Sequence, residues 1–147
     1  MKVKQLIKIL SSLDHEANLV VYDPANNGKD SFHYAIDGVN IVDAFTDDDA
    51  DALYESKNGI VSFSTSKKST TKYPVKVKQA LKKLESGNPK SEVVINIYTS
   101  PTEETYHSID AVDDLTDKSG LVSLKAHSAM KLQEIDTSSV YLSGLPF

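Results

Sequence analysis

The chain has 147 residues, of which 39% are hydrophobic and 25% charged, a composition typical of a soluble globular protein. It contains no Cys, which excludes disulfides and thiolate metal sites. The net charge of −5 combines 21 acids with 16 basic residues that are all Lys, and the lack of Arg disfavours sequence-specific nucleic-acid binding and phosphoryl transfer. No apolar run is long enough to span a membrane and no signal-peptide pattern is present, so we expect a cytoplasmic protein.

The first part of the chain predicts one helix followed by three strands. Apolar side chains recur at helical spacing through residues 3–13, which predicts a helix with one buried face. Three strands are expected after it, at residues 19–22, 32–42 (with a bulge at Gly38) and 59–64.

An acidic segment, residues 43–58, separates the second and third of these strands. Thr46 is a good N-cap residue, and Asn58-Gly59 suits a helix C-terminus. We therefore expect a short acidic helix or a solvated loop in this segment.

The second part of the chain repeats the pattern of the first. After a Lys-rich linker at 67–74, the helix sequence VKVKQALKKL at 75–84 matches MKVKQLIKIL at 1–10 in six of ten positions. Three further strands are expected at 93–98, 105–112 and 120–124. Their offsets from the first set are 74, 73 and 61, so the first copy holds 12 extra residues, in the acidic segment.

These offsets predict an α+β fold built by tandem duplication of an α-β-β-β unit, with one helix per half, a mostly antiparallel sheet and a pseudo-two-fold axis. We expect a first repeat at 1–66, the linker at 67–74, a second repeat at 75–125 and a C-terminal extension at 126–147. A unit of this size buries little surface alone, so the two halves should share one core. The extension has no counterpart, and it could add a strand or cover a surface of another subunit.

The helix VKQLIKILSSL at 3–13, a short polar hinge and the strand LVVY at 19–22 resemble a pattern found in small uncharacterised phage and prophage proteins. In that pattern a helix of the type ELIxxLxxLPxDAxVVV precedes a small antiparallel sheet. The resemblance implies an accessory protein of a phage or mobile element, and it supplies no functional residues.

The acidic segment holds the candidate site residues. Alternating Asp47, Asp49 and Asp51 suggest a calcium loop, but Ala52 and Asn58 stand where that loop requires Gly and Glu. We expect no metal site and interpret these acids as a surface for a basic protein partner. The candidate partner-binding residues are Asp47, Asp48, Asp49, Asp51 and Glu55.

Other chemistry is weakly supported. Asp37 with Glu55-Ser56-Lys57 has the residue types of a magnesium-dependent nuclease, but the triplet runs into the turn residues Asn58-Gly59. The histidines lack zinc-ligand spacing, and we interpret those on strands as half-buried groups bonded to neighbours. No nucleophile or phosphate-loop motif occurs, so no catalytic residue or cofactor is expected.

The sequence thus predicts a non-enzymatic binding protein, an accessory that engages or inhibits a host protein through an acidic surface. The alternative is a small-molecule-binding protein with its ligand where the two halves or two subunits meet. A metal-dependent hydrolase or nuclease is the least favoured reading. A protein partner is expected, with a homodimer as an option, and nucleic acid and membrane are not.

Overall fold

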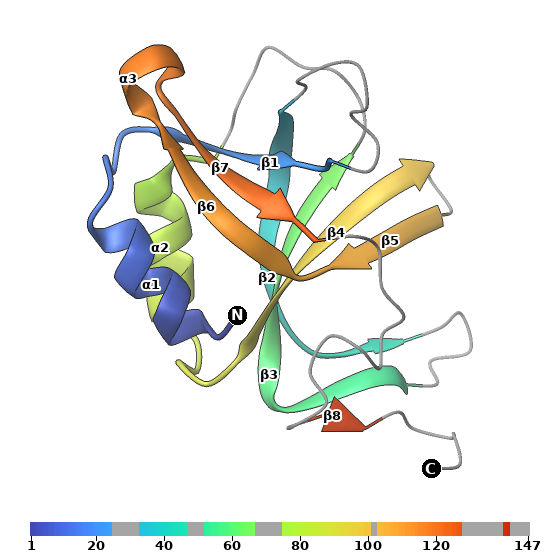
Figure 1. Ribbon diagram of the computed structural model, residues 1–147. Helices are drawn as coiled ribbons and strands as arrows, with labels where there is room; N and C mark the ends of the chain where they lie inside the picture. The colour runs from blue at the N-terminus through green and yellow to red at the C-terminus, as the bar shows by residue number, and fades with distance from the viewer. Residues whose placement is uncertain (25–32, 47–51, 67–74, 101–102, 128–139, 142–147) are drawn as a thin grey trace.

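The computed structural model describes residues 1–24, 33–46, 52–66, 75–100, 103–127 and 140–141. It shows an α+β fold in which one curled sheet forms most of the molecule and two helices lie side by side against it (Figure 1). Within the described residues, no helix is long and apolar enough to cross a membrane.

The structure contains both predicted helices and strands at all six predicted places. The helices are α1 (Val3–Ser11), α2 (Val77–Glu85) and the single-turn α3 (Thr116–Ser119). The strands are β1 (Asn18–Tyr22), β2 (Tyr34–Thr46), β3 (Ala52–Ser66), β4 (Glu92–Ser100), β5 (Glu103–His107), β6 (Ile109–Leu115), β7 (Leu121–Ala126) and β8 (Val140–Tyr141). The strand expected at 105–112 is divided into β5 and β6, and α3 was not expected.

The repeated KVKQ sequence starts both long helices in the same way. The backbone N–H of Lys2 donates to Gln5 Oε1 at 2.8 Å, and that of Lys76 donates to Gln79 Oε1 at 2.7 Å. Each glutamine thereby satisfies a backbone donor that the first turn of a helix leaves without a partner. The two glutamines of the repeated sequence therefore have the same capping role.

One mixed sheet has the strand order β5-β4-β3-β2-β1-β7-β6, with β8 paired to β3. The pairs β1–β7 and β3–β4 are parallel and join the two parts of the chain, whereas the other pairs are antiparallel. The ends of this order, β5 and β6, are separated in sequence only by Ser108. The sheet therefore curls until the chain itself connects its two ends.

Contacts between the two parts of the chain occur in matching pairs. Val3 N–H donates to Ser91 O, and Val77 N–H donates to Ala17 O, both at 2.9 Å. The parallel ladders match as well, because Ile60 faces Glu92 as Leu121 faces Asn18. Val3 and Val77, Ala17 and Ser91, and Asn18 and Glu92 are each 74 positions apart, and Ile60 and Leu121 are 61 positions apart. The matching contacts therefore have the same offsets as the repeated sequence.

The main hydrophobic core lies between the helices and one face of the sheet. It includes buried apolar residues of α1 and α2 together with alternate residues of the central strands. In β4, for example, Val93, Ile95 and Ile97 belong to this core. Asn96 and Tyr98 therefore lie on the opposite face of β4, because successive strand residues point to opposite sides.

The expectation of a helix or loop in the acidic segment is wrong where the structure describes it. Residues 43–46 end β2, and residues 52–58 begin β3. The strands extend because their backbones pair, with Ala44 facing Glu55 and Phe45 facing Tyr54. Ladder hydrogen bonds formed at a distance thus outweigh the local capping signal of Thr46.

Candidate interaction surface

The described residues of the acidic segment form a hairpin arm, defined here as residues 43–46 of β2 and 52–58 of β3. In Figure 1 the arm turns away from the curled sheet and lies with β8, apart from the helices. Gly59, at φ 84°, follows the arm within β3, and Gly120, at φ 70°, immediately precedes β7. A left-handed backbone favours glycine at both places.

The arm also contacts the C-terminal extension. β8 pairs with the arm through Glu55–Tyr141 and Ser56–Val140, in antiparallel register. The acidic segment and the C-terminal extension therefore meet in space. The extension adds a strand, which is one of the two roles that its sequence allows.

The structure places only one of the five sequence-predicted binding residues. The backbone of Glu55 lies in β3 of the arm. Asp47, Asp48, Asp49 and Asp51 lie outside the described residues, between the paired residues Thr46 and Ala52. Their role in partner binding stays a prediction.

The residue types of a nuclease site do not come together. Asp37 lies beside the pair Ile36–Thr65, whereas Glu55 faces Ala44 in the arm. Ala44 is seven positions after Asp37 along β2, which corresponds to about 23 Å at the usual rise per residue. The backbones of Asp37 and Glu55 are therefore not neighbours in the sheet, and the strand pairing gives no support for a shared magnesium site. No group of three or more possible metal ligands occurs among the residues that the structure describes.

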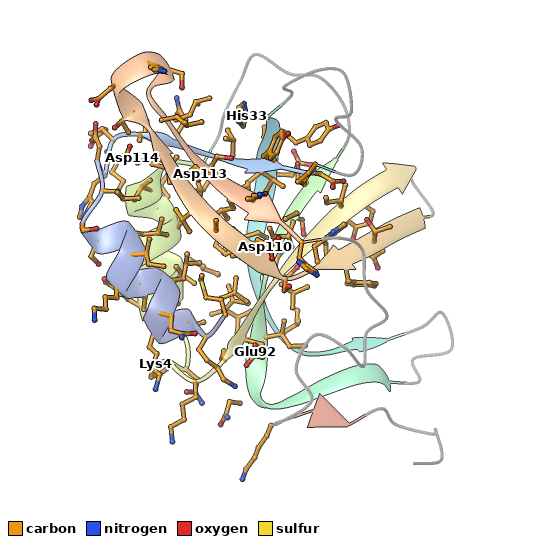
Figure 2. All side chains as sticks on the ribbon, in the orientation of Figure 1. Lys4, His33, Glu92, Asp110, Asp113 and Asp114 are labelled. Carbon is orange, nitrogen blue, oxygen red and sulfur yellow. The ribbon has the colours of Figure 1, made fainter. Side chains whose placement is uncertain are left out.

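Described acidic side chains gather along β5, β6 and α3. This surface, called here the acidic strand surface, consists of Glu104, Asp110, Asp113, Asp114 and Asp117, all exposed or half-exposed. Figure 2 shows Asp110, Asp113 and Asp114 along β6, whereas Lys4 lies on α1. No Lys occurs between residues 103 and 117, and the nearest basic residues are Lys118 on α3 and Lys125, which faces Ala111 across β6 and β7.

Two members of this surface have local structural roles. Asp114 Oδ1 accepts hydrogen bonds from the backbone N–H of Thr116 at 3.1 Å and from its hydroxyl at 2.6 Å. These bonds lower the pKa of Asp114 and fix the start of α3. Asp110 Oδ1 lies 2.7 Å from Nδ1 of His127, the residue that follows β7. Asp113 and Asp117 have no such bond within the described chain and present their charge to solvent.

A polar and aromatic cluster adjoins this surface on β4 and β5. In the antiparallel register Asn96 faces Tyr106 and Tyr98 faces Glu104, so the four side chains share one face. Asn96 Nδ2 donates to Glu104 Oε2 at 3.1 Å, and the Tyr106 hydroxyl donates to Glu104 Oε1. The carboxylate of Glu104 is therefore held by neutral donors.

The tyrosines of the cluster remain protonated at neutral pH. Burial, followed by the hydrogen bond and charge of Glu104, raises the pKa of Tyr106 well above its usual value. Burial and Glu104 also raise the pKa of Tyr98, although this residue is 39% exposed. Both phenols can therefore act as hydrogen-bond donors and aromatic surfaces, and neither is suited to act as a base at neutral pH.

Of the two histidines expected on strands, His107 lies on β5 and His33 immediately precedes β2, and both have structural partners. His107 is fully buried, and its ring nitrogens lie 2.7 Å from the backbone oxygen of His127 and 2.8 Å from Thr105 Oγ1. His33 is half-buried, with its ring centroid 5.8 Å from that of Tyr22. Burial lowers the pKa of His33, and the charge of Asp113 opposes this effect.

Sequence reasoning missed a buried carboxylate, Glu92, at the start of β4. Its side chain is 5% exposed and forms an ion pair with Lys2, while the N-terminal amine lies 3.9 Å away. The equivalent residue in the first copy is Asn18, so the offset of 74 gives no signal of a charge here. Glu92 links the start of α1 to β4 and has a structural role.

Comparison of the chain with protein-family models, with curated proteins and with solved structures finds no match.

Proposed function

We propose that this chain is a non-enzymatic binding protein that engages a basic region of a partner protein. The acidic strand surface is the observation that carries the proposal. It presents acidic side chains along β5, β6 and the start of α3, and no Lys occurs from residue 103 to residue 117. In keeping with the sequence resemblance, the proposal makes the protein a cytoplasmic accessory of a phage or mobile element.

Segregation of charge on the molecule supports this proposal. The exposed faces of α1 and α2 carry the lysines Lys4, Lys8, Lys78, Lys82 and Lys83. Opposite charges on separate elements give the molecule an electric dipole, and its field orients a charged partner as the two proteins approach each other. A basic partner is attracted to the strands and repelled by the helices.

Tandem duplication of an α-β-β-β unit is part of the same proposal. The matching hydrogen bonds at the starts of α1 and α2 and the matching parallel ladders support it. In this interpretation the duplicated portion is the scaffold. Binding then belongs to what the two copies do not share, namely the hairpin arm and the acids of the acidic strand surface other than Asp110, which matches Asp37.

Capture from host lysate with variant proteins tests the proposal. The variant Asp113→Asn/Asp117→Asn removes two free charges of the acidic strand surface. The control Asp37→Asn/Glu85→Gln removes two exposed charges elsewhere. We expect wild type and control to capture the same partner and the strand variant to lose it. No captured protein at all, or equal capture by the strand variant, would contradict the proposal.

The same experiment can examine the residues predicted from the sequence. A variant with Asp47, Asp48, Asp49 and Asp51 changed to Asn should also capture less partner if the arm contributes to binding. Unchanged capture by this variant would remove the arm acids from the contact surface.

A small-molecule ligand is the second candidate function, and one observation favours it. Two buried polar atoms, Asn96 Oδ1 and Ser123 Oγ, have no hydrogen-bond partner within the described structure. Buried polar atoms are usually satisfied, so such atoms are where a bound molecule could supply a partner. Native mass spectrometry of the purified protein should show a persistent extra mass if this function is correct, and the bare chain mass if it is not.

A further inference from the structure

We propose that Asn96, Tyr98, Glu104 and Tyr106 form a binding site for an organic cation, with a guanidinium group preferred. This inference deepens the proposed function, because it names the group of the partner that the surface recognises: an arginine side chain. The site is called here the Glu104 site.

The charge of Glu104 is the first argument for a cation. Its carboxylate accepts hydrogen bonds from the Asn96 amide and the Tyr106 hydroxyl, which are both neutral. None of the described lysines or histidines forms an ion pair with it. The negative charge on this face of β4 and β5 is therefore ordered by neighbours but not neutralised by them.

The aromatic residues are the second argument. Tyr98 faces Glu104 directly across the strands, and its ring is one of the few large apolar groups that the structure exposes. A cation beside a carboxylate and against a tyrosine ring gains both ion pairing and cation–π attraction. Exposed tyrosines of this kind are also frequent at the centres of protein interfaces.

Asn96 provides an independent observation that favours guanidinium. Its side chain is 5% exposed, its amide nitrogen is bonded to Glu104, and its Oδ1 has no partner in the described structure. A guanidinium group has five N–H donors in a plane, enough to reach both the carboxylate and a further acceptor. An ammonium group offers fewer donors and no flat face to lie on the tyrosine ring.

The same geometry argues against a metal ion and predicts weak binding. A metal ion would have to replace the donors around Glu104, and neutral phenols are poor ligands for hard cations. Asn96 Oδ1 is buried, so a guanidinium reaches it only after the side chains that cover it move aside. For a single side-chain analogue we therefore expect a dissociation constant on the order of 1 mM or weaker.

A titration followed by NMR of the backbone amides tests this site without any partner protein. The probes are N-acetyl-arginine amide, N-acetyl-lysine amide and, as a neutral analogue of the same shape, N-acetyl-citrulline amide. We expect saturable shifts at β4 and β5 with the arginine probe, weaker effects with the lysine probe and none with the citrulline probe. Glu104→Gln should weaken arginine binding about tenfold, and Tyr98→Ala should weaken it as well.

The control Glu85→Gln removes an exposed charge on α2 and should leave the titration unchanged. The proposal is overturned by any of three results: no saturable shift with arginine, citrulline or lysine binding as tightly as arginine, or unchanged binding in a folded Glu104→Gln protein. If Glu104→Gln does not fold, unchanged binding in Tyr98→Ala decides against the site. Arginine binding combined with failed lysate capture would retain this site and reject only the proposed function.

Discussion

The two lysines that precede the long helices provide a matched test of what burial adds to an ion pair. Lys2 and Lys76 occupy equivalent positions at an offset of 74. The side chain of Lys2 is 29% exposed and pairs with Glu92, which is 5% exposed. Lys76 Nζ lies 3.2 Å from Glu16 Oε2, and these side chains are 42% and 63% exposed. We therefore expect Lys2→Met to destabilise the protein and Lys76→Met to have no measurable effect.

The expected loss for Lys2→Met follows from the structure. Removing one partner of a fully buried ion pair costs about 3–5 kcal/mol, because the remaining charge has lost both water and its partner. Lys2 is only partly buried, and the N-terminal amine remains 3.9 Å from Glu92. We therefore expect a loss of about 2 kcal/mol in the free energy of unfolding.

Urea denaturation followed by circular dichroism measures this difference. With an m value of about 2 kcal/mol per molar urea, the midpoint of Lys2→Met should fall by about 1 M. The double variant Lys2→Met/Glu92→Gln should recover part of the loss, because it leaves no buried charge without a partner. Equal midpoints for Lys2→Met and Lys76→Met, or no recovery in the double variant, would refute the reasoning.

Three further predictions concern the glycine turns, the tyrosines and the hairpin arm. Gly59→Ala and Gly120→Ala should each lower stability by about 1 kcal/mol in thermal denaturation, because both backbones are left-handed; a variant as stable as wild type would contradict this. Above pH 10 the free energy of unfolding should fall, because the raised pKa values of Tyr98 and Tyr106 make the folded protein bind more protons than the unfolded one. Tyrosine absorbance should show that these two phenols ionise only when the protein unfolds, and their ionisation in the folded protein at the usual tyrosine pKa would contradict this prediction. The backbones of Ser56 and Val140 are paired and the chain has no Cys, so the variant Ser56→Cys/Val140→Cys should form a disulfide within one chain. Non-reducing electrophoresis measures this, with Asn58→Cys/Val140→Cys as the out-of-register control. Equal disulfide formation in both variants would contradict the pairing of β8 with β3.

Local sequence signals predicted α1, α2 and the buried strands for clear physical reasons. Apolar residues at helical spacing can be buried only if the segment is helical, and Gln5 and Gln79 cap the starts of both helices. The sequence also located the extra residues of the first copy, between strands now seen as β2 and β3. Gly38 was expected at a bulge, and the register shift lies next to it, between Ile36 and Gly38.

The acidic segment shows where local signals fail. Thr46 and Asn58-Gly59 have the residue types of helix ends, yet residues 52–58 are strand. The deciding contacts are the ladder pairs with β2 and β8, and β8 lies more than eighty residues later in the chain. A capping signal depends on a few neighbours, whereas strand pairing depends on residues that the local sequence does not identify.

The candidate surface was likewise only partly predictable. The absence of Lys between residues 103 and 117 is visible in the sequence, and it indicated an acidic stretch. That Asn96 and Tyr98 meet Glu104 and Tyr106 depends on the register of β4 with β5. The burial of Glu92 depends on the contact between the residues before α1 and the start of β4, which lie far apart in the sequence. By itself the sequence determined the helices, the strands and the repeated pattern, because these follow from periodic apolar residues. Only the tertiary structure decided the parallel joins and the neighbours of each charge, because strand register brings distant residues together.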